Sequence, residues 1–194
     1  MLRRSSSLLA ISCIMLAVAF GLGMFALPSA QAQGMKKDMK MADAVCLLYP
    51  TEGNTAEGII HFHEMNGEVM IHVELSGLEP NSTHGFHAHE YGDCSATDGT
   101  SAGGHYNPGK HPHALPPTTP RHAGDFGNVH ANDHGMVDTV ITVSNVSIDG
   151  PKNPLVGKGI ILHAKPDDGG QPTGNAGARI ACGVIGLSKP TMMK

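Results

Sequence analysis

The sequence has no tryptophan and contains only three tyrosines and five phenylalanines among its 194 residues. Residues typical of loops and turns are abundant instead, with 25 glycines and 13 prolines. A chain of this length is sufficient for one domain and an extension. We therefore expect a single loop-rich domain whose core contains few aromatic side chains.

Basic side chains are also scarce. Arg3 and Arg4 are the only charged residues in the first 32 positions, so all 17 acidic residues and 11 of the 13 basic residues follow them. That part of the chain carries a net charge of −6. A nucleic-acid-binding surface needs the opposite sign, so the charge argues against a nucleic-acid partner.

The first 32 residues form an apolar run, residues 8–27, followed by the small-residue box Ala30-Gln31-Ala32. This pattern predicts a secretory signal peptide over residues 1–32. The run approaches the ~20 residues of a membrane span, but its two glycines and the box favour cleavage over a retained anchor. We expect an exported protein, periplasmic or extracellular, with no membrane contact after cleavage.

Residues 33–42 are polar and contain three methionines. Methionine thioethers can bind Cu(I), but a flexible linker is the simpler interpretation of such a terminal segment. The predicted domain then extends over residues 43–190.

From Asp43 onward, short β-type runs alternate with turn clusters, and no stretch shows a convincing helical pattern. The eight runs are DAVCLLY, GIIHFHEM, EVMIHVELS, HGFHAHE, NVHA, GMVDTVITV, KGIILHA and ARIACGVIG. Two connections, residues 91–125 and 165–179, are long, and long ordered loops are usually functional. The pattern predicts an all-β fold, an eight-stranded antiparallel sandwich or barrel.

The most informative stretch is G-F-H-A-H-E at residues 85–90. His87 and His89 are two positions apart in a predicted strand, so both imidazoles lie on one face, roughly 7 Å apart, and can bind one metal ion. Neutral imidazole suits copper and zinc best. Further donors follow along the chain: His105, His113, His122, Asp125 and His163.

Several of the 13 histidines have a simpler structural interpretation. His61 and His63 also form an H-x-H pair, but Ile60 and Phe62 occupy the alternate face, so we expect both histidines on the solvent side. His72 alternates with apolar neighbours in the same way. His84 lies on the opposite strand face from His87, where a packed, hydrogen-bonded histidine is expected.

Three further histidines remain: His111, His130 and His134. His130 and His134 flank a predicted turn and are left outside the ligand set. His111 and His113 compete for one ligand position, and their spacing alone does not separate them.

Five motifs together resemble the copper/zinc superoxide dismutase family over about residues 44–187. They are G-F-H-A-H-E-Y-G-D, S-A-G-G-H-Y-N-P, R-H-A-G-D-F-G-N-V, L-H-A-K-P-D-D and G-N-A-G-A-R-I-A-C-G-V-I-G, in this order. Such a combination is far more specific than a single H-x-H. The resemblance implies a Greek-key β-barrel or sandwich, consistent with the strand pattern.

The resemblance also implies two metal sites that share one histidine. Copper is expected on His87, His89, His105 and His163, and zinc on His105, His113, His122 and Asp125. Four nitrogens suit tetragonal Cu(II), whereas three nitrogens and one carboxylate oxygen suit tetrahedral Zn(II). The family has the same spacing of eight and nine residues from His105 to His113 and on to His122, which favours His113 over His111.

Two residues matching the family have further expected roles. Asp167 matches a carboxylate that hydrogen-bonds a ligand of each metal and so sets imidazole orientation. Arg179 matches the arginine that draws the anionic substrate, superoxide, towards the copper. The implied reaction is dismutation of superoxide to dioxygen and hydrogen peroxide, with His105 carrying a proton.

The cysteines allow a disulfide after export. The resemblance pairs Cys94 with Cys182, which would tie the first long loop to the last strand, although the segment from Cys94 to His105 is longer than in the eukaryotic form. Cys46 is expected to be a small buried hydrophobic residue.

The resemblance also implies a homodimer, because Tyr91-Gly92, Leu155-Val156-Gly157 and Val184–Leu187 match segments that form the eukaryotic-type contact. Two alternative functions are a non-catalytic copper/zinc carrier of the same fold and a copper-only dismutase. The complete ligand set and Arg179 argue against the first alternative. His113, His122 and Asp125, which match zinc ligands, argue against the second.

Overall fold

A computed structural model describes residues 43–189. The predicted signal peptide and the methionine-containing linker lie outside these residues. Within the described part, no helix has the length and apolar character needed to cross a membrane.

The described part is all-β, with eight strands and one short 3-10 helix, Thr100–Ala102. The strands are β1 (Asp43–Pro50), β2 (Glu57–Met65), β3 (Glu68–Ser76), β4 (Thr83–His89), β5 (Asp125–His130), β6 (Val137–Val143), β7 (Gly159–His163) and β8 (Arg179–Leu187). Each of the eight runs that alternate in the sequence forms one of these strands. The predicted eight-stranded antiparallel fold is confirmed.

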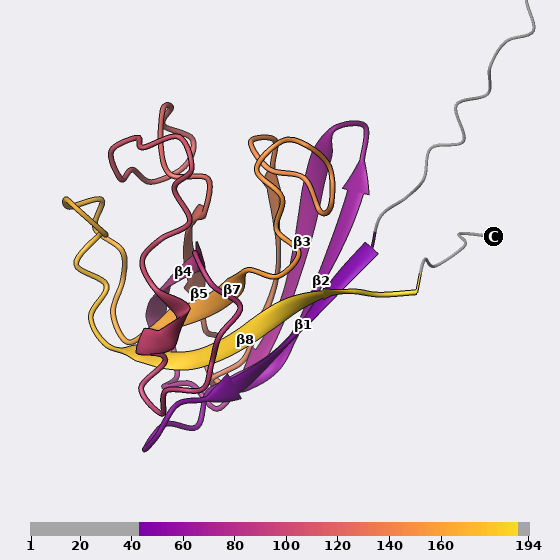
Figure 1. Cartoon of the computed structure of the whole chain (residues 1–194). Helices are drawn as coiled ribbons and strands as arrows, with labels where there is room; N and C mark the ends of the chain where they lie inside the picture. The colour runs from indigo at the N-terminus through magenta and orange to yellow at the C-terminus, as the bar shows by residue number, and fades with distance from the viewer. Residues whose placement is uncertain (1–42, 190–194) are drawn as a thin grey trace, which may run out of the picture. The chain divides into compact units, whose positions relative to one another are not determined.

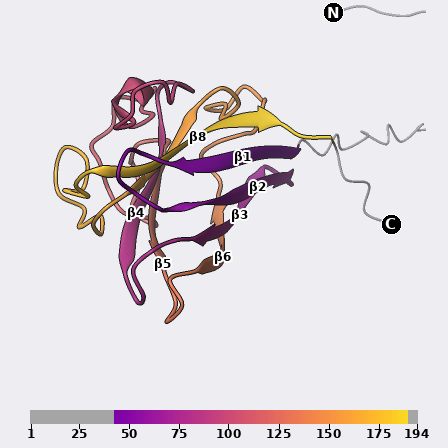
Figure 2. The ribbon, with the colours of Figure 1, turned by 90° about the horizontal axis from the view of Figure 1, so that it is seen from below.

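The strands form one antiparallel sheet in the order β5-β4-β7-β8-β1-β2-β3-β6. Because the two end strands, β5 and β6, contact each other, the sheet curves into a nearly closed barrel (Figure 1). Seen from below, β8, β1, β2, β3 and β6 run side by side in that order (Figure 2). The outer surface of the barrel over β4 and β7 is covered differently from the outer surface over β2 and β3.

The barrel interior is filled by the apolar residues of each alternating strand. Fully buried examples are Ile60, Phe62, Ile71, Val73, Phe86, Ile160, Leu162 and Ile185. Side chains of neighbouring residues in a strand point to opposite faces, so His61 and His63 of β2, His72 of β3, and His87 and His89 of β4 point outward. Cys46 is buried in this core, as predicted, and burial raises the pKa of its thiol to about 12.

The outward histidines of β2 and β3 differ from those of β4 in their burial. His61, His63 and His72 are half-exposed, as expected for the solvent side. By contrast, His87 and His89 are almost fully buried, although they also point away from the core. Two long loops account for this difference.

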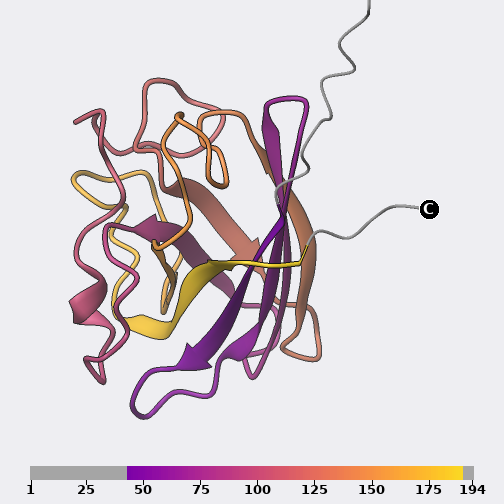
Figure 3. The same ribbon diagram turned by 45° about the vertical axis from the view of Figure 1, so that its right-hand side comes forward.

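The first long loop connects β4 to β5 and the second connects β7 to β8. Both lie on the same side of the barrel, the first in magenta to salmon and the second in yellow (Figure 3). The Cys94–Cys182 disulfide, with a Cα–Cα distance of 5.9 Å, joins the first loop to β8 and confirms the predicted pairing. The loops therefore cover the outer surface of β4 and β7.

Candidate metal centre

The centre begins with the alternation of β4. Phe86 and Ala88 point into the barrel core, which places His87 and His89 on its outer surface. The pairing of β4 with β5 shifts between Gly85 and His87, and that of β7 with β8 shifts between Leu162 and His163. Such irregularities redirect side chains, and here each lies beside a histidine of the centre.

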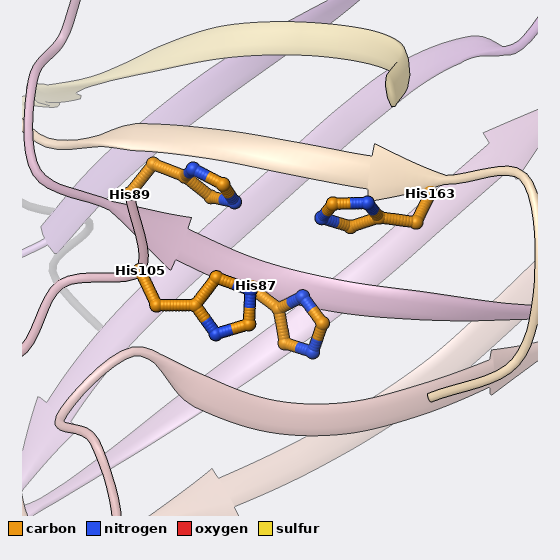
Figure 4. A group of neighbouring side chains, drawn as sticks. All are labelled: His87, His89, His105 and His163. Carbon is orange, nitrogen blue, oxygen red and sulfur yellow. The ribbon is translucent and has the colours of Figure 1, made fainter. Parts of the chain in front are cut away.

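Four imidazoles converge above β4. His87 and His89 come from β4, His163 from the end of β7 and His105 from the first long loop, and their rings face a common space (Figure 4). One nitrogen of each ring lies within 4.8 Å of one nitrogen of every other. A bridge between His89 and His105 anchors the loop at this point.

Hydrogen bonds fix the tautomers of three of these rings. His89 Nδ1 donates to the Gly103 carbonyl at 3.0 Å, and His163 Nδ1 donates to the Gly177 carbonyl at 3.2 Å. His87 uses Nε2, which lies 2.8 Å from an Asp167 oxygen. In each ring the other nitrogen keeps its lone pair.

The ring nitrogens that face the common space have no hydrogen-bond partner. All four are buried: His87 Nδ1, His89 Nε2, His105 Nε2 and His163 Nε2. Buried polar atoms normally have partners, so four unpartnered lone pairs facing one another indicate a site for a cation. The donor set, four imidazole nitrogens, suits copper.

The electrostatics keep these imidazoles in the form that binds metal. Burial lowers the pKa of His87 to about 4, against an opposing hydrogen bond to Asp167. Burial and the neighbouring His87 lower the pKa of His163 to about 3, and burial lowers that of His89 well below its usual value. All three rings are neutral at pH 7.

A second group surrounds one oxygen of Asp125, at the start of β5. His105 Nδ1, His113 Nδ1 and His122 Nδ1 lie 2.9, 3.0 and 3.1 Å from Oδ1. Burial favours the neutral carboxyl, but the hydrogen bonds from His105 and the Ala114 backbone N–H prevail and lower the pKa of Asp125 to about 2. Three nitrogens beside one carboxylate oxygen form a donor set suited to zinc.

His105 belongs to both groups. Its Nε2 faces the four-histidine group, whereas its Nδ1 lies in the group around Asp125. His113, the alternative to the exposed His111, is buried in the second group. The structure thus brings together all seven residues that the sequence proposed as ligands.

Asp167, from the second long loop, connects the two groups. Its Oδ2 lies 2.8 Å from His87 Nε2 and its Oδ1 2.9 Å from His113 Nε2. Burial opposes ionisation, but these two bonds lower the pKa of Asp167 well below its usual value. Gly174, whose φ is +77°, packs against both Asp167 and His113, and a Cβ there would collide with them.

Arg179 lies at the start of β8, beside the four-histidine group. Its guanidinium donates to the carbonyls of Gly99 at 2.7 Å and Gly103 at 2.6 Å. The Gly103 carbonyl therefore accepts from both Arg179 and His89. Gly103 has a φ of +77°, and a Cβ would lie 2.7 Å from the Tyr91 ring, so only glycine suits this position.

Sequence reasoning missed several supporting residues. The Asn128 side chain bonds the Asp167 backbone in both directions, at 2.7 and 2.9 Å, and Gln171 does the same for His113, at 2.6 and 3.1 Å. Such bonds to backbone atoms leave no recognisable spacing in a sequence. His84, expected to be packed, bonds the His163 carbonyl at 2.7 Å.

The sequence model of one protein family, described as copper/zinc superoxide dismutase (SODC), matches residues 56–185, which is more than half of the chain. This chain belongs to the copper/zinc superoxide dismutase family. The match lies within the predicted domain, residues 43–190, and includes every residue of the two histidine groups.

A solved structure described as "Crystal Structure Analysis of the clock protein EA4" is similar to this member of the superoxide dismutase family. The two are 36% identical, with a TM-score of 0.69, and the alignment covers 76% of this chain and 96% of the other.

Proposed function

We propose that this chain is a superoxide dismutase that converts superoxide to dioxygen and hydrogen peroxide. His87, His89, His105 and His163 would hold copper, and His105, His113, His122 and Asp125 would hold zinc. The observation that carries the proposal is the position of His105, with one ring nitrogen in each of two complete donor sets. A site with a single metal would not need both sets.

When bound, copper supplies a one-electron redox couple and zinc a fixed positive charge. His105 holds and releases a proton at Nε2, the atom that faces the copper ligands. Two superoxide ions then yield one dioxygen and, with two protons, one hydrogen peroxide. In each cycle His105 would take one of these protons from water and pass it on, and water would supply the other directly, so that two hydroxide ions are left.

Arg179 and the loops prepare the site for an anion. The Arg179 guanidinium is held by two carbonyls beside the histidines, so its positive charge has a fixed position. The loops leave each ligand residue no more than 6% exposed, so only small molecules can reach the site. Superoxide is small and anionic, so it suits a site that is largely covered and lies beside a fixed positive charge.

Export and dimerisation complete the proposal. The Cys94–Cys182 disulfide supports an exported protein, periplasmic or extracellular, because disulfides persist in oxidising compartments. Tyr91 is 60% exposed and Val184 42% exposed, which supports a homodimer through this surface. Leu155 is fully buried, so that residue of the expected contact belongs to the core instead.

The decisive experiment is reconstitution of residues 33–194 with copper and zinc. We expect one copper and one zinc per chain, measured by elemental analysis, and rapid superoxide loss in pulse radiolysis. Stoichiometric metal without superoxide loss would instead identify a copper/zinc carrier. Copper without zinc would identify a copper-only enzyme.

A further inference from the structure

A separate set of histidines lies on the outer surface of β2 and β3. Their core-facing neighbours Ile60, Phe62, Ile71 and Val73 are fully buried, so His61, His63 and His72 point outward. The metal centre lies over β4 and β7, a different outer surface of the barrel. None of the three histidines takes part in the proposed dismutase chemistry.

The register of β2 and β3 places the three histidine side chains at the corners of a triangle. His61 pairs directly with His72 across β2 and β3, and opposite residues have Cβ atoms about 5 Å apart. His61 and His63 are two positions apart on β2, and their rings stack with centroids 6.4 Å apart. His63 and His72 are diagonal neighbours, about 7 Å apart by sheet geometry.

Carboxylates orient two of the three rings. His63 Nδ1 lies 2.8 Å from Asp43 Oδ1, and His72 Nε2 lies 2.8 Å from Asp138 Oδ1. A ring that donates one N–H to a carboxylate keeps a lone pair on its other nitrogen and becomes a stronger ligand. His63 Nε2 is therefore available to a metal ion. His72 Nδ1 lies 3.9 Å from Glu74 Oε2, beyond hydrogen-bond distance, so its lone pair is available too and Glu74 adds negative charge beside it.

We propose that His61, His63 and His72 form a third, exchangeable site for a divalent ion that prefers imidazole, zinc(II) or copper(II). Three imidazoles with a fourth, water-filled position are a common coordination for zinc. Asp43 and Asp138 supply negative charge beside the ion. The inference does not depend on the proposed dismutase activity.

The site closes by side-chain rotation. The side chain of His72 is 37% exposed and its partner Asp138 is 80% exposed, so the two can move together without disturbing the core. Asp43 is buried, so His63 keeps its bond and position, and His61 and His72 turn towards it. The rings are not gathered around one point in the structure, unlike those of the metal centre. Binding must supply this ordering, so we expect weaker binding than at the centre.

The test uses the full chain preloaded with copper and zinc, so that both sites of the centre are filled. Zinc(II) alone is then titrated in a non-chelating buffer and followed by calorimetry, while NMR of the histidine rings identifies those that respond. We expect one additional zinc(II) per chain with micromolar affinity, and shifts confined to His61, His63 and His72.

Variants make the test specific. His61→Asn and His72→Asn should each abolish the additional binding, and Asp138→Asn should weaken it about tenfold through loss of the supporting carboxylate. His134→Asn is the matched control, because His134 is an exposed histidine far from the triangle in sequence and is 77% exposed. Superoxide loss should be unchanged in all four variants, which verifies their folding.

Absence of an additional zinc(II) in the folded wild type would overturn the proposal. So would additional binding that persists in both His61→Asn and His72→Asn, because the ion would then lie elsewhere.

Discussion

His105 is the residue on which the two-metal assignment depends most. We expect His105→Ala to lower the content of both copper and zinc, because each donor set loses one nitrogen. His113→Ala should lower mainly zinc, since His113 belongs only to the set around Asp125. Elemental analysis of the purified variants after dialysis measures this difference.

The double variant His61→Ala/His63→Ala serves as a control for the His105 experiment. Both metals of the centre should remain at normal stoichiometry after dialysis, because neither histidine contacts the centre. Normal zinc and normal activity in His105→Ala would refute the shared-histidine assignment.

The pKa values of two histidines of the centre also predict how the stability of the metal-free protein depends on pH. Burial holds the pKa of His87 at about 4 and that of His163 at about 3, whereas both rings protonate near pH 6.5 in the unfolded chain. Between pH 6.5 and about 4 the unfolded state thus binds more protons, so stability falls as the pH falls. Each ring contributes about 1.4 kcal/mol per pH unit in this window.

Urea unfolding of the metal-free protein between pH 7.5 and 4.5 measures this slope. The contribution of Asp125 lies outside the window, because its lowered pKa matters only below about pH 4. His163→Gln should flatten the dependence. A wild-type stability that does not change with pH would contradict the assigned burial of these rings.

At the scale of loops and strands, Asp167 links the second long loop to ligands of both metals. Asp167→Asn should weaken copper and zinc binding together by about 10- to 100-fold, because both His87 and His113 lose a carboxylate partner. Competition with a chelator measures both affinities.

Asp168→Asn is a close control for this experiment. Asp168 is exposed, and its side chain bonds only Gly170 and Asn175 within the described part of the chain. Equal effects of the two substitutions would show that Asp167 acts through the loop in general and not through the two histidines.

The elements also show how far the sequence could predict this structure. The strands were predictable because apolar residues alternate within each run, as with Ile60 and Phe62 in β2. The positions of the ligands followed from family motifs, not from alternation, since β2 and β4 both carry an H-x-H. Only the covering loops distinguish the two pairs, and the contacts of Asn128 and Gln171 with backbone atoms arise from folding.

For the whole molecule, the proposed function predicts a particular source of electrostatic steering. Superoxide dismutases are a known example of steered, nearly diffusion-limited enzymes, so the general effect is expected. Here the second loop between Asp167 and Arg179 contains no basic residue, and its only charged residue is Asp168. Arg179 is thus the main nearby cation apart from the metals.

We expect Arg179→Ala to slow superoxide loss strongly while both metals remain bound, and Arg179→Glu to slow it further. Higher salt should slow the wild type, because the screening length is about 10 Å at 0.1 M, but should affect Arg179→Ala much less. Pulse radiolysis across a salt series measures these slopes. An unchanged slope in Arg179→Ala would assign the steering to other basic groups, such as Lys110, Arg121 or Lys165.

A second prediction for the whole molecule concerns its assembly into a homodimer. An apolar groove of about 640 Å³ beside β1 and β8 is lined by Leu47, Tyr49 and Val184, all exposed. A homodimer would cover this surface, and Val184→Glu should dissociate it by burying an unpaired charge. Sedimentation of the wild type at micromolar concentration should show a dimer, and a monomer there would refute the prediction.

The position of the metal centre outside the barrel has a consequence for the biogenesis of the protein. Phe86, Ala88, Ile160 and Leu162 complete the core without any ligand side chain, so collapse of the barrel can precede the arrival of metal. Under the proposed export and metal binding, the chain would be translocated without cargo, fold, and acquire its ions as a late maturation event. Cellular metal supply would thus determine when a finished scaffold becomes active, and a store of inactive protein could be activated without new synthesis.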